Sequence, residues 1–144
     1  AVCSSENIAN ALRLATSTFN VNGIAEAAVI AALDDPEYTQ FILDDNTKEM
    51  NRIKAKCREL RLPYMDSVTN FISINVGRPN GEVVDAMRDR GIRISTPGYE
   101  KTGTFIRVST GQADNTTAFL TALEEILEHL SSKSHETSKS GFED

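Results

Sequence analysis

The chain has 144 residues, a formal net charge of −6 and 25% charged residues. This length suits one ordinary domain with its own core. The negative charge and the lack of a basic stripe argue against a nucleic-acid partner. No apolar run reaches membrane-spanning length, and no basic segment precedes an apolar one near the start of the sequence. We therefore expect a cytoplasmic protein without a membrane span or signal peptide.

Cysteine and histidine spacings predict neither a disulfide framework nor a metal site. The two cysteines, Cys3 and Cys57, lie far apart, and the histidines are His129 and His135. These positions match no metal-ligand motif. Cys57 falls at an apolar helical position, which predicts a small buried side chain rather than a reactive thiol.

Two short helices are predicted first. One spans residues 5–16, with Ser4 or Ser5 as its cap. The second spans residues 24–33 and is rich in alanine on several sides. Such a helix packs closely against another surface, and that surface need not lie in this chain.

A long third helix has a clear start. Asp35 is placed to cap it, Pro36 suits the first helical position, and Glu37 complements the positive end of the helix dipole. Apolar residues then recur at steps of three and four to about Leu60. The sequence therefore predicts a continuous helix from residue 36 to about residue 60.

Three alternating segments follow, and they predict strands at residues 70–76, 92–95 and 104–109. A turn after the first strand leads into a short helix that Asn80 can cap and Gly91 ends.

The last predicted helix runs from about Ala113 to Leu130. Residues 131–144 are polar and serine-rich, which predicts a disordered tail. The order of elements predicts an α+β fold. It consists of a small, mostly antiparallel sheet of three to four strands with helices packed on one face.

Arg107 is the residue best suited to ligand binding. On an alternating strand it lies on the face opposite Ile106 and Val108. Its planar guanidinium can hold a carboxylate or phosphate through two parallel hydrogen bonds. A solvated edge-strand arginine and a structural ion pair are the alternatives that the residues leave open.

Other candidates are weaker, and no catalytic set is evident. Asn70 opens a strand before an aromatic residue, and Tyr99 lies in a loop between Gly98 and Gly103. Either side chain could reach a ligand, although a plain strand-start asparagine and an exposed loop tyrosine are commoner. The sequence contains no nucleophile elbow and no phosphate-binding glycine loop. None of the six lysines has an obviously buried setting. The lysines are residues 48, 54, 56, 101, 133 and 139.

Several segments, in this order, resemble the histidinol-phosphate aminotransferases. They are Phe19-Asn20-Val21-Asn22, the alanine-rich stretch through Leu33-Asp34-Asp35, Asn70-Phe71, Gly91-Ile92-Arg93-Ile94, Gly98-Tyr99 and Ile106-Arg107-Val108-Ser109-Thr110-Gly111. The resemblance covers about residues 5–130. It implies the C-terminal small domain of a class I/II, fold-type-I aminotransferase, without the large domain that carries pyridoxal phosphate.

The resemblance also implies roles for segments and residues. Residues 1–34 would be helices from the junction with the large domain, with Asn20 and Asn22 near that junction. Residues 35–130 would form the small domain. Through the full enzyme the substrate would be an amino acid or keto acid.

Substrate-binding residues follow from the same resemblance. Arg107 would bind the substrate anion, with Asn70 and Tyr99 near the substrate. Because the cofactor lysine belongs to the absent part, this chain alone would bind no pyridoxal phosphate and would hold no catalytic residue.

One position departs from the family pattern. Ser95 stands where the family has an arginine that helps to hold the substrate phosphate, so an amino donor other than histidinol phosphate becomes plausible. A different hypothesis also stays open, in which the chain is a free-standing, non-catalytic binding or self-association domain. In that case the alanine-rich helix would need a new partner, most simply a second copy in a homodimer.

Overall fold

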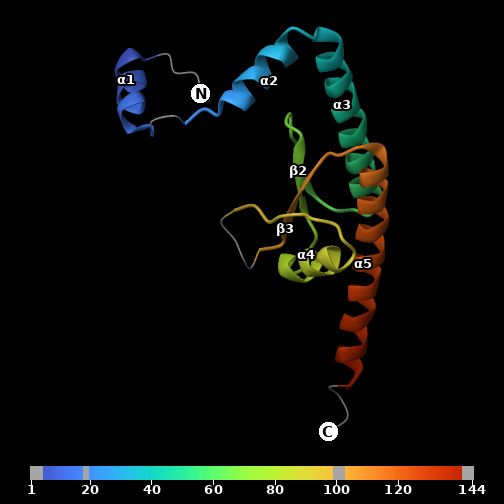
Figure 1. Ribbon diagram of the computed structural model, residues 1–144. Coiled ribbons are helices and arrows are strands. Elements are labelled where there is room, and N and C mark those ends of the chain that lie inside the picture. The colour runs from blue at the N-terminus through green and yellow to red at the C-terminus, as the bar shows by residue number, and fades with distance from the viewer. Residues whose placement is uncertain (1–4, 18–19, 99–102, 141–144) are drawn as a thin grey trace. The chain divides into compact units, whose positions relative to one another are not determined.

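The computed structural model describes residues 5–17, 20–98 and 103–140, with the backbone alone for residues 133–140. The chain divides into two units, residues 1–41 and residues 42–144, and each is described by itself. The elements are α1 (Glu6–Ala15), α2 (Gly23–Leu33), α3 (Pro36–Glu59), β1 (Tyr64–Met65), β2 (Phe71–Asn75), α4 (Asn80–Asp89), β3 (Phe105–Ser109) and α5 (Ala113–Ser140) (Figure 1).

The first unit holds α1 and α2. Ser5, one of the two predicted caps, begins α1, and Asn22, which the sequence analysis does not name as a cap, begins α2. Ser5 Oγ accepts a hydrogen bond from the Ile8 N–H at 3.5 Å, and Asn22 Oδ1 accepts one from the Ile24 N–H at 2.9 Å. No residue of either helix is buried. The Leu33 side chain is 78% exposed. Within this unit, the apolar side chains of α2 are therefore not packed into a core.

The predicted start of α3 is confirmed. Asp35 Oδ1 accepts a hydrogen bond from the Tyr38 N–H at 2.9 Å, and the helix begins at Pro36. At its other end the Leu62 N–H donates to the Cys57 carbonyl at 2.8 Å. The turn that makes this bond passes through Arg61 at φ 55°, a left-handed conformation.

The sheet is antiparallel with strand order β1-β2-β3. Ser73 lies opposite Arg107 and Phe71 opposite Ser109. Because side chains alternate along a strand, each strand presents one set to the core and the other to the opposite face. The buried set is Ile72 and Ile74 of β2 and Ile106 and Val108 of β3.

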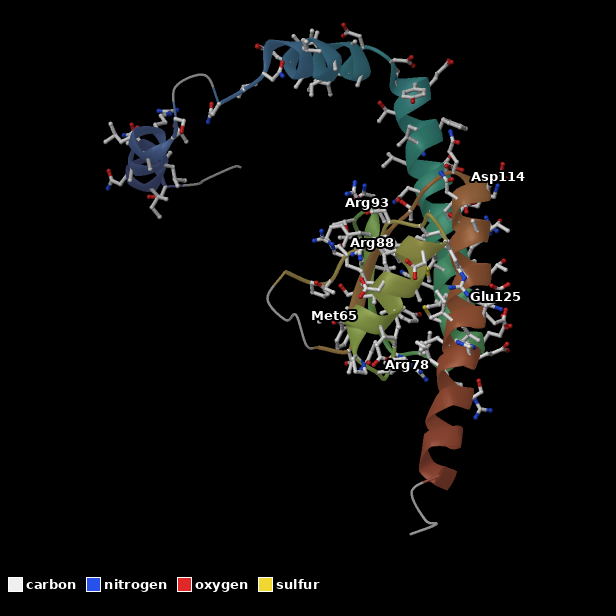
Figure 2. The ribbon with its side chains drawn as sticks, turned by 60° about the horizontal axis from the view of Figure 1, so that its bottom comes forward. Met65, Arg78, Arg88, Arg93, Asp114 and Glu125 are labelled. Carbon is white, nitrogen blue, oxygen red and sulfur yellow. The ribbon has the colours of Figure 1, made fainter. Side chains whose placement is uncertain are left out.

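Helices α3, α4 and α5 pack on this buried face of the sheet, as the fold prediction states (Figure 1). Figure 2 shows α5 alongside α3. The helices contribute Met50, Ile53 and Cys57 of α3, Val83 and Met87 of α4, and Phe119, Ala122, Leu123 and Ile126 of α5. Cys57 is 0% exposed, so the predicted burial of this thiol is confirmed.

A buried carboxylate joins α3 to the start of α5. Glu49 is 0% exposed, and its Oε2 accepts a hydrogen bond from Arg52 Nη1 at 2.6 Å. The same arginine donates to the Ala113 carbonyl at 3.1 Å and to Thr117 Oγ1 at 2.6 Å. Arg52 therefore connects the two long helices through its two acceptors on α5, Ala113 and Thr117, while Glu49 holds it from within α3.

Residues 92–95 do not form the predicted full strand. A single bridge joins Ser95 to Arg107, and residues 92–94 are not paired with β3. Gly91 turns the chain at φ 76°, and Ile92 then packs against the core. Only the last residue of the predicted strand therefore pairs with β3. The short strand β1, which the sequence analysis does not predict, completes the three-stranded sheet.

One smaller prediction is also corrected. Asn80 does not cap α4: its side chain is buried, and Nδ2 donates to the Phe105 carbonyl at 3.0 Å.

Helix α5 continues to Ser140, beyond the predicted end at Leu130. Ser131 Oγ donates to the Leu127 carbonyl at 2.7 Å, and no proline or glycine interrupts residues 131–140. Disorder of residues 131–144 stays a prediction.

Candidate functional site

The face of the sheet away from the helices carries the candidate site. Alternation places Phe71 and Ser73 of β2 and Phe105, Arg107 and Ser109 of β3 on this face. These side chains are half-buried or exposed. On this face the aromatic rings of Phe71 and Phe105 and the hydroxyl groups of Ser73 and Ser109 therefore surround the guanidinium of Arg107.

Arg107 stands in the middle of β3 with two neighbours that hold its guanidinium. Its Nε donates to Ser95 Oγ at 3.2 Å. Its Cζ lies 5.1 Å from the ring centroid of Phe71, within cation–π range. Among the residues that the structure describes, no carboxylate forms a salt bridge with Arg107. This arrangement disfavours the structural ion pair that the sequence leaves open.

Of the other predicted site residues, only Asn70 is described in the same unit as Arg107. Asn70 precedes β2 and lines a groove with Asn46 and Thr110, and its carbonyl accepts a hydrogen bond from the Thr110 N–H at 2.8 Å. Tyr99 lies outside the described residues.

Asn20 and Asn22 belong to the first unit. Both are exposed, and the Asn22 side chain caps α2.

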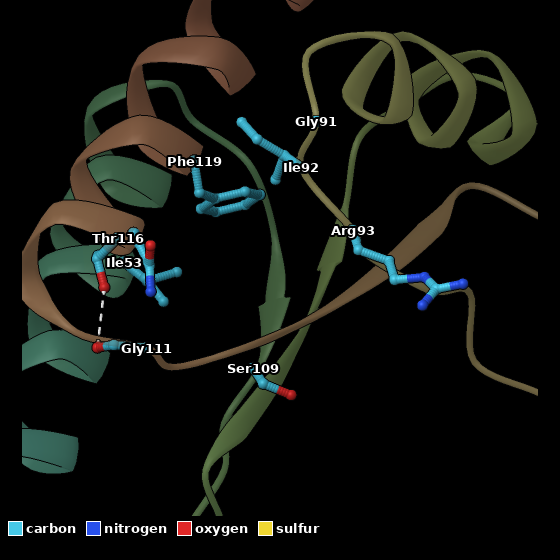
Figure 3. Close-up of a pocket in the computed structure, with 9 residues that line it drawn as sticks. Ile53, Gly91, Ile92, Arg93, Ser109, Gly111, Thr116 and Phe119 are labelled. Atoms are coloured by element: carbon cyan, nitrogen blue, oxygen red, sulfur yellow. Dashed lines mark hydrogen bonds between the residues drawn. The ribbon is translucent and has the colours of Figure 1, made fainter.

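A cavity of about 240 Å³ opens where residues 91–93 leave the edge of β3. Its lining includes Ile53, Ile92 and Phe119, with Arg93 as its charged member. Figure 3 shows Arg93 extending away from Ile92 and Phe119. The lining also includes the polar residues Ser109, Asn115 and Thr116, so the cavity has both apolar and polar walls.

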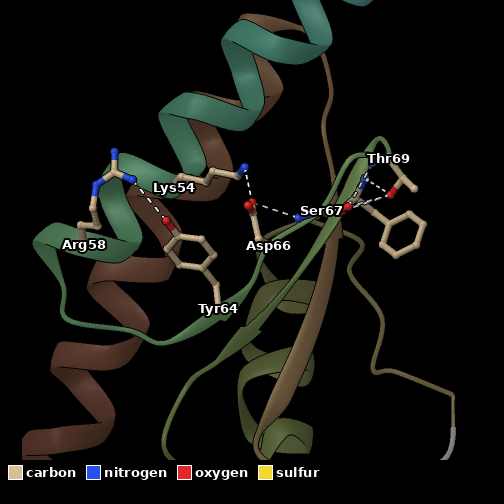
Figure 4. A network of polar contacts seen from close by, with 7 residues as sticks. Lys54, Arg58, Tyr64, Asp66, Ser67 and Thr69 are labelled. Carbon is tan, nitrogen blue, oxygen red and sulfur yellow. Dashed lines mark hydrogen bonds and ion pairs between the residues drawn. The ribbon is translucent and has the colours of Figure 1, made fainter.

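The described lysines do not fit the role of a cofactor lysine, which must lose its proton to bond to pyridoxal phosphate. Lys48 is exposed. Lys54 pairs with Asp66, whose carboxylate also accepts from the Ser67 N–H (Figure 4). Hydrogen bonds to Glu124 and Glu59 raise the pKa of Lys56, the direction opposite to that needed.

The sites of the remaining lysines are not described. Lys101 lies outside the described residues, as do the side chains of Lys133 and Lys139.

Within the described part of the chain, no group of three or more histidine, cysteine, aspartate or glutamate residues could hold a metal ion. No described helix is both long and apolar enough to cross a membrane.

Sequence reasoning missed both neighbours of Arg107. The alternation of residues 92–95 predicts that Ser95 lies on a strand. Which residue of β3 lies opposite Ser95 depends on contacts between distant segments, and the alternation does not contain that information. Phe71 lies diagonally across from Arg107, and diagonal contacts need the same register. A strand-pairing pattern alone therefore could not find either contact.

The fold and the site together define an α+β domain with helices on one face of an antiparallel sheet and an exposed arginine, Arg107, on the other. Comparisons with known proteins agree with this class. The family model for aminotransferase class I and II matches residues 1–123. The chain belongs to this family.

Relatives are histidinol-phosphate aminotransferases. The enzyme of Caldicellulosiruptor saccharolyticus is 34% identical over 123 residues, which are 85% of this chain and 34% of that protein. Histidinol-phosphate aminotransferase 2 of Pseudomonas aeruginosa is 33% identical over 126 residues, 88% of this chain and 34% of that protein. The chain thus spans about a third of the length of these relatives.

A solved structure shows the same fold. The histidinol-phosphate aminotransferase of Sinorhizobium meliloti in complex with pyridoxal-5'-phosphate matches with a TM-score of 0.70 and 29% identity. The match covers 86% of this chain and 35% of that one. The resemblance seen in the sequence segments is therefore confirmed at the level of family and fold.

Proposed function

We propose that this chain supplies the small-domain part of a pyridoxal-phosphate-dependent aminotransferase. Such an enzyme transfers an amino group between an amino acid or histidinol phosphate and a 2-oxo acid. Family membership and the pyridoxal-phosphate complex of the Sinorhizobium meliloti relative support the proposal. The proposal includes a cytoplasmic enzyme, since thiols such as Cys57 stay reduced in that compartment.

The observation that carries the proposal is the setting of Arg107. Its guanidinium lies on the open face of the sheet, held by Ser95 and Phe71, without a carboxylate partner among the described residues. A guanidinium in this state can form two parallel hydrogen bonds to a carboxylate. In the proposed role Arg107 binds the anionic end of the substrate.

Finer roles belong to the same proposal. Asn70 and Tyr99 would contact the substrate, and Asn20 and Asn22 would lie at the junction with the large domain. The exposed apolar side chains of α2 support a packing surface at that junction.

The first experiment tests Arg107 on this chain. We expect titration calorimetry to detect 2-oxoglutarate binding and Arg107→Ala to weaken it by about tenfold or more, because a hydrogen bond to a charged group contributes about 1.5–3 kcal/mol. Arg107→Lys keeps the positive charge but loses the planar guanidinium with its two parallel N–H groups. Its affinity for 2-oxoglutarate should therefore lie between those of wild type and Arg107→Ala. Arg88→Ala, at an arginine with a 68% exposed side chain on α4, is the matched control. Equal affinity in all four proteins would refute the role of Arg107.

The second experiment tests whether the chain catalyses transamination alone. We expect no turnover when the chain is mixed with pyridoxal phosphate, glutamate and a 2-oxo acid, because the described lysines are exposed or paired with carboxylates. The full-length enzyme of Caldicellulosiruptor saccharolyticus serves as the positive control. Steady turnover with a lysine-dependent absorbance band would refute this part of the proposal.

The alternative is a free-standing domain that binds or self-associates without catalysis. The exposed Ile24 and Leu33 of α2 favour it, because an apolar helix in water gains from burial. Sedimentation at high concentration distinguishes the two, since the alternative requires a dimer or larger species. A strict monomer contradicts the alternative.

A further inference from the structure

The sequence contains two asparagine-glycine steps, Asn22-Gly23 and Asn80-Gly81. Asparagine is one of the thermolabile residues, and a following glycine leaves the next backbone nitrogen without a side chain beside it. That nitrogen can attack the asparagine side chain, which converts the residue into aspartate or its isomer. The structure places the two steps in opposite surroundings.

Asn22-Gly23 lies open at the start of α2, and both residues are exposed. Among the described residues, no heavy atom outside the neighbouring backbone lies within 4 Å of the position that a Cβ would take on Gly23. Gly23 is the first residue of α2, so its N–H has no acceptor within the helix. The hydrogen bond that holds the Asn22 side chain runs from the Ile24 N–H to Oδ1, at 2.9 Å. Because helix ends fray, this bond opens without unfolding of the rest of the chain.

Asn80-Gly81 lies at the start of α4, and its asparagine is enclosed. Asn80 is 1% exposed. Its Nδ2 donates to the Phe105 carbonyl at 3.0 Å, and its backbone N–H donates to the Gly103 carbonyl at 2.9 Å. For the same reaction the amide must leave β3 and the first turn of α4 must unwind. The reaction at Asn80 therefore requires local unfolding of the second unit.

We propose that Asn22 is a site of spontaneous modification and that burial protects Asn80 from the same reaction. The Gly23 nitrogen forms a bond to Cγ of Asn22, the Cγ–Nδ2 bond breaks, and the Gly23 proton leaves with the side-chain nitrogen as ammonia. Water then opens the cyclic imide. Opening at the Cγ–N bond gives aspartate, and opening at the backbone C–N bond gives isoaspartate. The reaction needs water alone, so it does not depend on the proposed function of Arg107.

The two products act differently on α2. Aspartate keeps an oxygen that can accept from the Ile24 N–H, and its negative charge lies at the positive end of the helix dipole. Isoaspartate routes the main chain through Cβ and Cγ, so its carboxylate no longer stands in the capping position. Modification of Asn22 therefore either preserves or removes the cap of α2, according to which bond water opens.

The experiment incubates the chain in mildly alkaline buffer made with heavy-oxygen water, and fragment-ion mass spectrometry assigns each modified residue. A product formed during the incubation carries one heavy oxygen atom, which separates it from a residue modified beforehand. We expect Asn22 to react at least about tenfold faster than Asn80 in native buffer, because Asn80 reacts only from an opened state. In urea the two rates should become similar, since both steps then lie in unfolded chain.

Paired glycine variants test the attacking atom. Gly23→Ala places a methyl group beside the nitrogen and should slow the modification of Asn22 at least severalfold. Gly81→Ala is the matched control and should leave the rate at Asn22 unchanged. Far-UV circular dichroism checks that each variant folds.

Each part of the proposal has an outcome that would overturn it. Equal rates at Asn22 and Asn80 in native buffer would overturn the protection of Asn80. An Asn22 that reacts in urea but not in native buffer would overturn the open site at the start of α2. Modification of Asn22 that Gly23→Ala leaves unchanged would overturn attack by the Gly23 nitrogen.

Discussion

Cys57 illustrates how position controls the chemistry of a single residue. The thiol lies in the core formed by α3, the sheet and α5, and it is 0% exposed. Burial raises the pKa of Cys57 to about 11, while the nearby charge of Arg58 acts weakly in the other direction. Because the thiolate is the reactive form, the side chain is unreactive at neutral pH.

We predict that Cys57 reacts with a thiol reagent only when the core opens. In a Cys3→Ser variant at pH 8, labelling should be slow, and its rate should follow unfolding as urea is added. Labelling at the rate of a free cysteine in native buffer would contradict this, and the same variant in 6 M guanidinium is the control for full reactivity.

Helix ends provide a paired prediction at the scale of elements. Arg61, after α3, and Gly91, after α4, both adopt positive φ, 55° and 76°. Glycine adopts this conformation without steric cost, whereas other residues do not. We expect Arg61→Gly to stabilise the fold by up to about 1 kcal/mol and Gly91→Ala to destabilise it by about 1 kcal/mol. Urea unfolding measures both, and changes of the same sign would contradict the prediction.

The hydrogen bonds by which Arg52 joins α3 to α5 depend on the charge of its neighbour Glu49. Burial alone would raise its pKa, but hydrogen bonds from Thr116 and Arg52, with the charges of Arg52 and Lys48, lower it below its ordinary value of 4.5. A lowered folded-state pKa means that the carboxylate contributes stability above pH 4.5. This contribution is lost as pH falls through the folded-state pKa.

We therefore predict that Glu49→Gln destabilises the fold by about 1–3 kcal/mol at pH 7, because Arg52 loses its charged acceptor. The difference from wild type should shrink as the pH falls below 4.5. Urea unfolding from pH 7 to pH 3 measures it, and Glu128→Gln, at an exposed position on α5, is the control. A difference that does not change with pH would contradict the assignment.

At the scale of the whole molecule, the chain consists of two units with different roles. Residues 42–144 contain the core, whereas α1 and α2 contain no buried residue. All residues of the core cluster lie in residues 42–144.

We predict that the double change Ile24→Glu and Leu33→Glu alters the unfolding free energy of the core by no more than about 0.5 kcal/mol. Ile53→Ala, at a core residue that is 1% exposed, should cost about 2–5 kcal/mol. Denaturant unfolding followed by circular dichroism compares them. A loss above about 1.5 kcal/mol in the double variant would contradict the prediction.

Local signals in the sequence determined the elements. Asp35 and Pro36 begin α3, alternation identifies β2 and β3, and the α+β class follows from their order. These predictions succeed because caps, turns and periodicity act over a few neighbouring residues. The family was also visible in the segments, because their residues and spacing lie along the chain.

The tertiary structure alone decided which residues meet. Residues 92–94 of the predicted strand stay unpaired and Ile92 packs against the core, while Ser95 at its end pairs with Arg107. The register that sets Phe71 and Ser95 against the guanidinium depends on contacts between distant segments, as does the burial of Glu49. At each of these positions, packing between distant segments competes with the local secondary-structure propensity. A pattern of neighbouring residues therefore cannot predict the contact.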